Sequence, residues 1–427
     1  MLKSLRTEDW VSTIIGAIIL ALVILLHGVQ LNGAPVMRNE IVLFFVIGVL
    51  TYLGYLFMGN KDKKGGYFIS FIAIFALAWV SGWLSNLTLV REVTICDLTG
   101  AETITNRETI GSLLGLESVL FAVTIGLIIR NTIGLPKFMA DAVKSEYFIK
   151  AGLVVLGSSI LFSEVMRAGA LGMIQGIAVV LSVWYFSFWL STKIFKIDQE
   201  MSALLSSAVS ICGVSAAIAT NGAIKGDPKK LSFVISLVLI VAIPMMYVMP
   251  YVAVWIGLTP EVAGAWIGGT IDTTAAVVAA GALHGPAAEQ VAVIVKSSQN
   301  ALLGGAALII SIYWSYRGTS DEQLRPSGAV IWERFPKFVL GFLLASLVFS
   351  LFFDEQTGRE LARAANGGAR SMLFSLAFVC IGLETDFRYI FKKENAKYIW
   401  SFLVAQGFNI VITLVLAFFL FRNFILG

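Results

Sequence analysis

Apolar runs long enough to cross a membrane recur from one end of this chain to the other, and they limit its fold more than any other feature. A helix needs about 20 apolar residues to cross a bilayer. Of the 427 residues, 58% are hydrophobic and only 14% are charged, whereas a soluble domain usually carries about 25% charged residues. We therefore expect an all-α polytopic membrane protein.

The runs predict about 11–13 transmembrane segments. Residues 1–110 contain three of them and a polar loop, which we interpret as a peripheral N-terminal region. Residues 111–427 form the expected transporter core. The first segment is interpreted as a retained helix, because the Gly-Ala-Pro-Val stretch that begins at Gly33 is a poor signal-peptide cleavage site.

Two polar, glycine-rich interruptions, Ser207–Ala216 and Gly268–Ala276, fall inside apolar stretches. Non-helical backbone at membrane depth persists only when it is buried in protein or lines a cavity. In secondary transporters such breaks mark the place where the solute binds. Each interrupted segment is either a broken helix that crosses the membrane or a re-entrant hairpin, and the sequence leaves both open.

The distribution of Lys and Arg predicts the orientation, because cytoplasmic loops carry an excess of these residues. They cluster in four loops that share one side if every segment crosses, which places the N-terminus in the cytoplasm. Lys225, Lys229 and Lys230 join that side only if the interrupted segments are hairpins. The residues of the four loops are Lys61, Lys63, Lys64; Arg130, Lys137, Lys144; Arg317, Arg325, Arg334, Lys337; and Arg388, Lys392, Lys393, Lys397.

Two stretches resemble each other, Ala151–Ile160 and Leu376–Thr385. Each follows a short segment and precedes a longer helix. Their positions along the chain give them opposite orientations if every segment crosses. Inverted repeats are common in secondary transporters, so we expect an inverted-repeat architecture.

The two interruptions supply the candidate substrate-binding residues. Backbone N–H groups at the start of a half-helix can bind an anion without a basic side chain, although small residues also serve close helix packing. The candidates are Ser207, Ser210, Cys212, Gly213 and Ser215 in the first break, and Gly268, Gly269, Thr270, Thr273 and Thr274 in the second.

Asp272 and Lys296 are the candidate ion-coupling residues. An Asp at the centre of a membrane segment costs about 2.5–3.5 kcal/mol on insertion scales, so it needs a partner or a wet cavity. Lys296, in the next segment, can be that partner. A proton or a solute ion would then compete with Lys296 for the carboxylate. The alternative is a structural salt bridge, which would not need the hydroxyl groups that flank Asp272.

Other classes of protein find little support. The three cysteines and two histidines have no metal-ligand spacing, so neither a metal site nor a cofactor is expected. Cys212 and His284 could serve as nucleophile and base, but no nucleophile elbow, zinc helix or phosphate loop accompanies them. We expect neither an enzyme nor a nucleic-acid partner.

At these motifs the chain resembles the YeiH-type family of bacterial membrane proteins, also called the sulfate exporter family. The resemblance covers about residues 113–421. It implies inverted repeats, crossed broken helices, alternating access and a distant relationship to cation/proton antiporters, in a protein of the bacterial inner membrane. Two stretches depart from the family pattern. Asp272 stands where the family has His and Thr273 where it has Asp, and Ser-Ser-Gln follows Lys296 where the family has Leu-Thr-Arg. The matching motifs are Ser210–Ala217, Ile271–Gly281, Val293–Lys296 and Ile381–Asp386.

Together these features predict a secondary transporter that moves a small anion by alternating access. The family name suggests sulfate, sulfite or an organosulfur acid, coupled to H⁺ or Na⁺. The alternative is a cation/proton antiporter of the Na⁺/H⁺ type that uses Asp272 and Lys296. The bilayer is the expected environment, and a homodimer remains one option for the oligomeric state.

Overall fold

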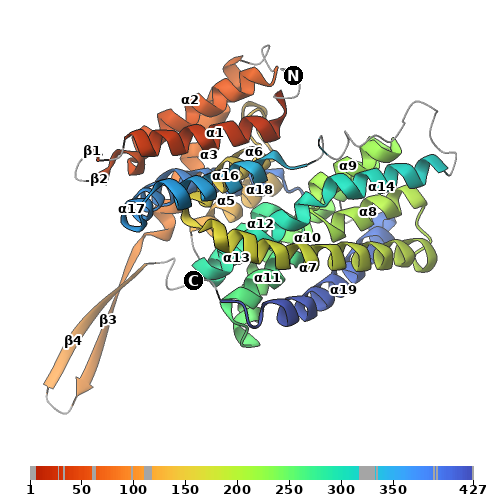
Figure 1. Cartoon of the computed structure of the whole chain (residues 1–427). Coiled ribbons are helices and arrows are strands. Elements are labelled where there is room, and N and C mark those ends of the chain that lie inside the picture. Colours follow the sequence, from red (N-terminus) through yellow and green to blue (C-terminus); the bar gives the residue numbers. More distant parts are fainter. Residues whose placement is uncertain are drawn as a thin grey trace. The chain divides into compact units, whose positions relative to one another are not determined.

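The chain is a helical, polytopic membrane protein, as its composition predicts (Figure 1). The computed structural model describes residues 6–26, 28–31, 34–59, 64–97, 100–109, 118–316, 332, 335–387, 390 and 393–425. Eight helical spans in this part of the chain are long and apolar enough to cross a membrane. Several shorter apolar helices accompany them. Seven basic loop residues lie outside the described residues: Lys61, Lys63, Arg317, Arg325, Arg334, Arg388 and Lys392.

The eight spans are formed by ten helices, because two spans are interrupted. They are α1 (Glu8–Leu25), α2 (Glu40–Phe57), α3 (Lys64–Ser85), α7 (Phe162–Trp189), α10 (Pro228–Trp255), α13 and α14 (Pro286–Ala301, Leu303–Tyr316), α17 and α18 (Glu355–Ala365, Ser371–Glu384) and α19 (Ala396–Phe421). The shorter helices are α5 (Ser118–Thr132), α6 (Ser145–Leu156), α8 (Gln199–Ser210), α9 (Val214–Ile224), α11 (Pro260–Thr270), α12 (Thr274–His284) and α16 (Lys337–Phe352). Two small antiparallel pairs occur, β1 (Gln30–Leu31) with β2 (Ala34–Pro35), and β3 (Thr88–Asp97) with β4 (Gly100–Thr109).

The contacts divide the chain into two compact units. The first contains Met1–Gly152 and Ala364–Glu384, and the second contains Leu153–Arg363 and Thr385–Gly427. The expected boundary between residues 110 and 111 lies outside the described residues, so that division remains a prediction. Both polar interruptions belong to the second unit.

The two stretches proposed as an internal repeat make the same kind of contact, each within its own unit. Gly382 of α18 lies against the backbone of α5, where a Cβ on Gly382 would come 2.7 Å from the Cα of Gly126. Gly157, in the 3₁₀ turn that follows α6, lies against the backbone of α16 at Phe342. Gly157 and Gly382 occupy matching positions in the two stretches. In each case only glycine permits so close a backbone approach, and this supports the repeat.

The first interruption is the turn of a helical hairpin made of α8 and α9 (Figure 1). The residues after α9 return to the beginning of α8. The N–H of Asp227 donates to the carboxylate of Glu200. The Lys230 ammonium lies 2.7 Å from carboxylate oxygens of both Asp198 and Glu200. The two ends of the hairpin are therefore adjacent, and its turn is at the opposite end.

The second interruption is also the turn of a hairpin, made of α11 and α12. Helix α13 runs beside both arms. Gly264 of α11 packs on Ala288 near the start of α13, and Gly281 of α12 packs on the neighbouring Glu289. At the other end of α13, Asn300 donates a hydrogen bond to Thr274, the first residue of α12. The arms are therefore antiparallel, with their open end at the start of α13.

Helix α10 connects the open ends of the two hairpins. It has 28 residues and extends about 42 Å, enough to cross the apolar core of a bilayer. The open end of hairpin α8–α9 lies at the beginning of α10, beside Lys230, and α11 begins just after the end of α10. The two turns meet at Gly213 and Asp272, beside Val238 of α10. The structure thus favours two re-entrant hairpins that enter from opposite sides over two helices that cross.

Candidate functional site

The turn of the first hairpin requires glycine. Helix α8 ends at Ser210 and α9 begins at Val214. Gly213, the residue before α9, has φ +61°, a conformation that side chains rarely adopt. A Cβ on Gly213 would also lie 2.7 Å from Val238 and 3.2 Å from the Cβ of Asp272. Gly213 therefore serves both the turn and the contact between the hairpins.

The turn of the second hairpin carries the buried carboxylate. Helix α11 ends at Thr270, and α12 begins at Thr274 after the extended residue Thr273. The Thr273 hydroxyl accepts a hydrogen bond from the N–H of Ala276 and so caps α12. Asp272 lies between them with 1% of its surface exposed.

Side chains of α13 bind the carbonyl groups at the ends of α8 and α11. The Lys296 ammonium donates to the carbonyl of Ile211 (2.7 Å) and to the side-chain oxygen of Gln299 (2.9 Å). The Gln299 amide in turn donates to the carbonyl of Ser210 (2.9 Å) and to that of Gly269 (3.4 Å). Carbonyl groups that end a helix inside a membrane need such partners.

Side chains of α19 bind the same two helix ends from another side. The Asn409 amide donates to the carbonyls of Val209 (3.1 Å) and Thr270 (3.2 Å). The Gln406 amide donates to Thr270 as well (3.0 Å). The side-chain donors of α13 and α19 together neutralise the negative ends of α8 and α11.

The N-termini of α9 and α12, which carry the positive ends of the helix dipoles, have no comparable set of side-chain partners within the described residues. Gly213 offers no side-chain cap to α9. At α12 the Thr273 hydroxyl satisfies Ala276, while the N–H groups of Thr274 and Ala275 precede the first intrahelical bond. Because Gly213 and Asp272 are in contact, the two helices begin next to each other. The junction of the hairpins therefore offers backbone N–H donors in a buried setting.

Lys296 is the cation of this junction. Only 1% of its surface is exposed, and its charge acts on Asp272. Both groups are held in the apolar interior, where an unpaired charge would cost several kcal/mol. One positive and one negative side chain leave the junction with a formal charge of zero.

Several buried oxygen atoms around the second turn have no hydrogen-bond partner. Each belongs to a side chain with no more than 5% of its surface exposed. Such atoms are rare in folded proteins, and an ion or a water is one reason for them. They are Thr270 Oγ1, Asp272 Oδ2, Ser297 Oγ, Asn300 Oδ1 and Gln406 Oε1.

The structure brings most of the predicted residues to the junction. Ser210, Cys212, Gly213 and Ser215 lie at the first turn or next to it, as Gly269, Thr270, Asp272, Thr273 and Thr274 do at the second. Two others serve packing. Ser207, one turn before the end of α8, accepts a hydrogen bond from Trp184. Gly268 lies against the backbone of α13 at Ala292.

Four amide side chains at the junction were not among the predicted site residues. Gln299, Gln406 and Asn409 bind the helix ends at the turns, and Asn300 binds the start of α12. Their signal in the sequence was a polar amide within an apolar helix. Nothing in the sequence identifies the carbonyl groups that they bind, which are 30 to 200 residues away.

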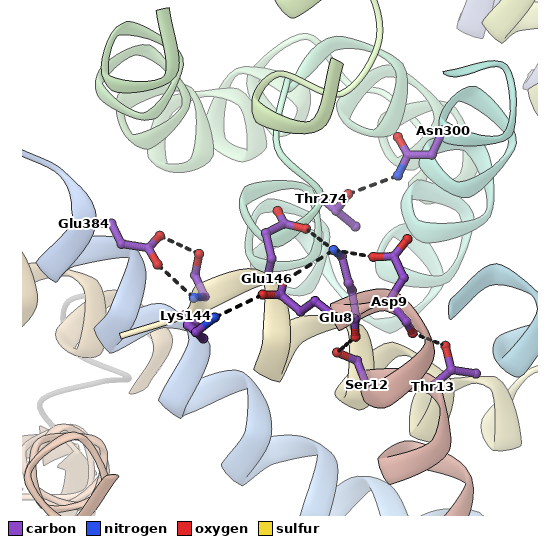
Figure 2. Close-up of polar contacts among 11 residues, drawn as sticks. Glu8, Asp9, Ser12, Thr13, Lys144, Glu146, Thr274, Asn300 and Glu384 are labelled. Carbon is purple, nitrogen blue, oxygen red and sulfur yellow. Dashed lines mark hydrogen bonds and ion pairs between the residues drawn. The ribbon is translucent and has the colours of Figure 1, made fainter. Parts of the chain in front are cut away.

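The first unit has a polar cluster of its own. The Lys150 ammonium lies within 3.7 Å of carboxylates from Glu8, Asp9 and Glu146. Figure 2 labels these three acidic residues. Glu384, at the end of α18, accepts hydrogen bonds from the N–H and the hydroxyl of Ser145 and so caps α6. These contacts hold α1 and α18 against α6, and a role in the stability of the fold is enough to explain them.

Comparison with known proteins places the chain in a family of membrane proteins. A family model described as conserved hypothetical protein 698 matches residues 93–402. A UPF0324 membrane protein of Rhodopirellula baltica is 37% identical over 393 residues, which cover 88% of this chain and 68% of that protein. Another, from Nitratidesulfovibrio vulgaris, is 33% identical and covers 89% and 63%. A third, from Nitrosomonas europaea, is 29% identical and covers 90% and 89%. No solved structure matches the chain.

Proposed function

Since the chain belongs to the UPF0324 family of membrane proteins, we propose that it is a secondary transporter whose solute binds where the two hairpins meet. The solute is a small anion, and transport proceeds by alternating access. The sulfate-exporter resemblance suggests sulfate, sulfite or an organosulfur acid.

One observation carries this proposal. Side-chain donors bind the carbonyl groups at the ends of α8 and α11. The N-termini of α9 and α12 lie next to each other, and among the described residues no equivalent set of side-chain acceptors binds their N–H groups. A helix N-terminus carries roughly half a positive charge and presents N–H groups that bind anions. Two such ends at one buried place favour an anion over a neutral or cationic solute.

The hairpins also provide a route to alternating access. They open at opposite ends of α10 and meet at their turns. Movement of hairpin α8–α9 would expose the junction to one side of the membrane, and movement of α11–α12 would expose it to the other. The N-terminus is proposed to be cytoplasmic and the membrane to be the inner one, because this places the Lys-rich open end of the first hairpin inside.

A second candidate is a cation/proton antiporter. The buried Asp272 beside Lys296 favours it, because a cation and a proton could exchange on that carboxylate. An enzyme is the least supported class. Cys212 lies at the turn of the first hairpin, whereas His284 ends α12 at the open end of the second, so they do not form a nucleophile and base.

Thermal unfolding of the detergent-purified protein tests the choice. A ligand that binds the folded state raises the midpoint, and the rise grows as the concentration exceeds the dissociation constant. We expect stabilisation by one or more of sulfate, sulfite, thiosulfate, a sulfonate or a carboxylate, each added as its choline salt. Uptake of the same anion into proteoliposomes would then show transport. Stabilisation by Na⁺ or Li⁺ with no response to any anion would favour the antiporter.

A further inference from the structure

The buried oxygens without partners belong to the second turn and to the parts of α13 and α19 near it. Asn300 donates its amide N–H to the Thr274 hydroxyl at 3.1 Å, which holds the Asn300 amide against the start of α12, two residues after Asp272. Ser297 lies one turn before Asn300 on α13 and shares its face. Asp272 Oδ2, Ser297 Oγ and Asn300 Oδ1 are all buried and all without a hydrogen-bond partner.

A second pair lies at the end of α11. The Gln406 nitrogen faces the carbonyl of Thr270, so its oxygen must face away, and that oxygen has no partner. The Thr270 hydroxyl also has none. All five atoms are oxygens, and a carboxylate, amide carbonyls and hydroxyls are the groups that hard cations prefer.

A proton on Asp272 would not account for this set. A protonated Asp272 could donate one hydrogen bond to one of these oxygens, and the others would still lack a partner. A cation can contact several of them at once. The charge at the junction favours a monovalent ion. Asp272 is the carboxylate of the second turn, and within the described residues no three His, Cys, Asp or Glu side chains come together to hold a metal ion. Divalent cations usually take more carboxylates than one.

We infer that the second hairpin turn holds a sodium ion, bound by Asp272 Oδ2, Ser297 Oγ and Asn300 Oδ1. Thr270 and Gln406 supply further oxygens at the same turn. This inference deepens the proposed function and rests on it, because it names Na⁺ as the coupling ion. The ion adds a positive charge beside the N-termini of α9 and α12 and so raises the affinity of the junction for the anion.

Ser297→Ala tests the assignment because the Ser297 hydroxyl makes no hydrogen bond in the protein. A ligand role predicts that the variant folds normally and binds Na⁺ more weakly. Ser298→Ala is the matched control, since the Ser298 hydroxyl donates to the carbonyls of Gly169 in α7 and of Ile294. The measurement is the unfolding midpoint of each full-length protein, titrated with NaCl against choline chloride at constant ionic strength.

We expect saturable stabilisation by NaCl in the wild type and in Ser298→Ala. The half-saturating Na⁺ concentration should rise at least tenfold in Ser297→Ala, and the Na⁺ response should vanish in Asp272→Asn. An equal response to KCl or MgCl₂, no response in the wild type, or an unchanged response in Ser297→Ala would each overturn the inference. Stabilisation by a choline salt of the anion, measured without Na⁺, keeps the two proposals separate. If that response persists while the Na⁺ response is absent, the anion carrier stands and the sodium site falls.

Discussion

The proposed anion site depends on backbone N–H groups, which can be removed one at a time at the start of α12. Thr274 is the first residue of that helix. Its N–H has no carbonyl to bond within the helix, so proline is tolerated there. The preceding residue, Thr273, has φ −100° and ψ 138°, the extended conformation that a following proline requires. Thr274→Pro should therefore fold while it deletes one proposed anion donor.

Thr274→Val is the control. The valine has nearly the same shape as threonine and keeps the backbone N–H, but like proline it removes the hydroxyl that accepts from Asn300. Loss of that bond costs about 1 kcal/mol of stability in both variants. The difference between them isolates the N–H group.

The size of the effect follows from the bond that is lost. A hydrogen bond to a charged group contributes about 1.5–3 kcal/mol, and about 1.4 kcal/mol corresponds to a tenfold change in affinity. We expect Thr274→Pro to bind the stabilising anion roughly 10 to 100 times more weakly than Thr274→Val. Isothermal titration of both folded proteins measures this. Equal affinities within twofold would refute the idea that the α12 N-terminus binds the anion.

Three further predictions concern the junction and the topology. Lys296→Met removes the donor to Ile211 and leaves Asp272 without its countercharge, so unfolding should become about 3–5 kcal/mol easier; adding Asp272→Asn should recover part of that loss in a double-mutant cycle. Gly213→Ala should lower the unfolding midpoint more than Gly257→Ala, because both glycines have positive φ but only at Gly213 would a Cβ meet another atom, Val238 at 2.7 Å; equal losses would leave backbone strain as the only cause. Single cysteines at Lys229 and Glu261, in a chain otherwise free of cysteine, should react with a membrane-impermeant maleimide from opposite sides, and labelling from one side would contradict the two re-entrant hairpins.

The sequence could single out the two interruptions because their signal is local. A carboxylate, glycines and hydroxyls within an apolar run stand out against the cost of burying them. Asp272 and Gly213 were identified in this way, and the structure brings them into contact. The helical class followed from composition by the same argument.

The hairpins themselves could not be assigned from the sequence. A broken helix and a re-entrant hairpin have the same apolar pattern and differ only in what their ends contact. The decisive contacts are tertiary, between Asp227 and Glu200 in one hairpin and between α13 and both arms in the other. The only sequence hint was the position of Lys225, Lys229 and Lys230, which suited the cytoplasmic side if the segments re-entered.

The charge of Asp272 bears on how the two ions cooperate, because Asp272 belongs to the inferred sodium site. With Asp272 and Lys296 both charged, the junction is formally neutral, and a bound Na⁺ makes it positive beside the two helix N-termini. The anion and Na⁺ should therefore bind cooperatively, and linkage requires that each raise the affinity of the other by the same factor, typically about 5- to 150-fold. Titrating the anion with and without saturating Na⁺, and Na⁺ with and without the anion, measures both factors. At a fixed Na⁺ concentration, Ser297→Ala should reduce both the effect of Na⁺ on the anion affinity and the effect of the anion on the Na⁺ affinity. An anion affinity that does not change with Na⁺ would show that the charge at Asp272 does not couple the two ions.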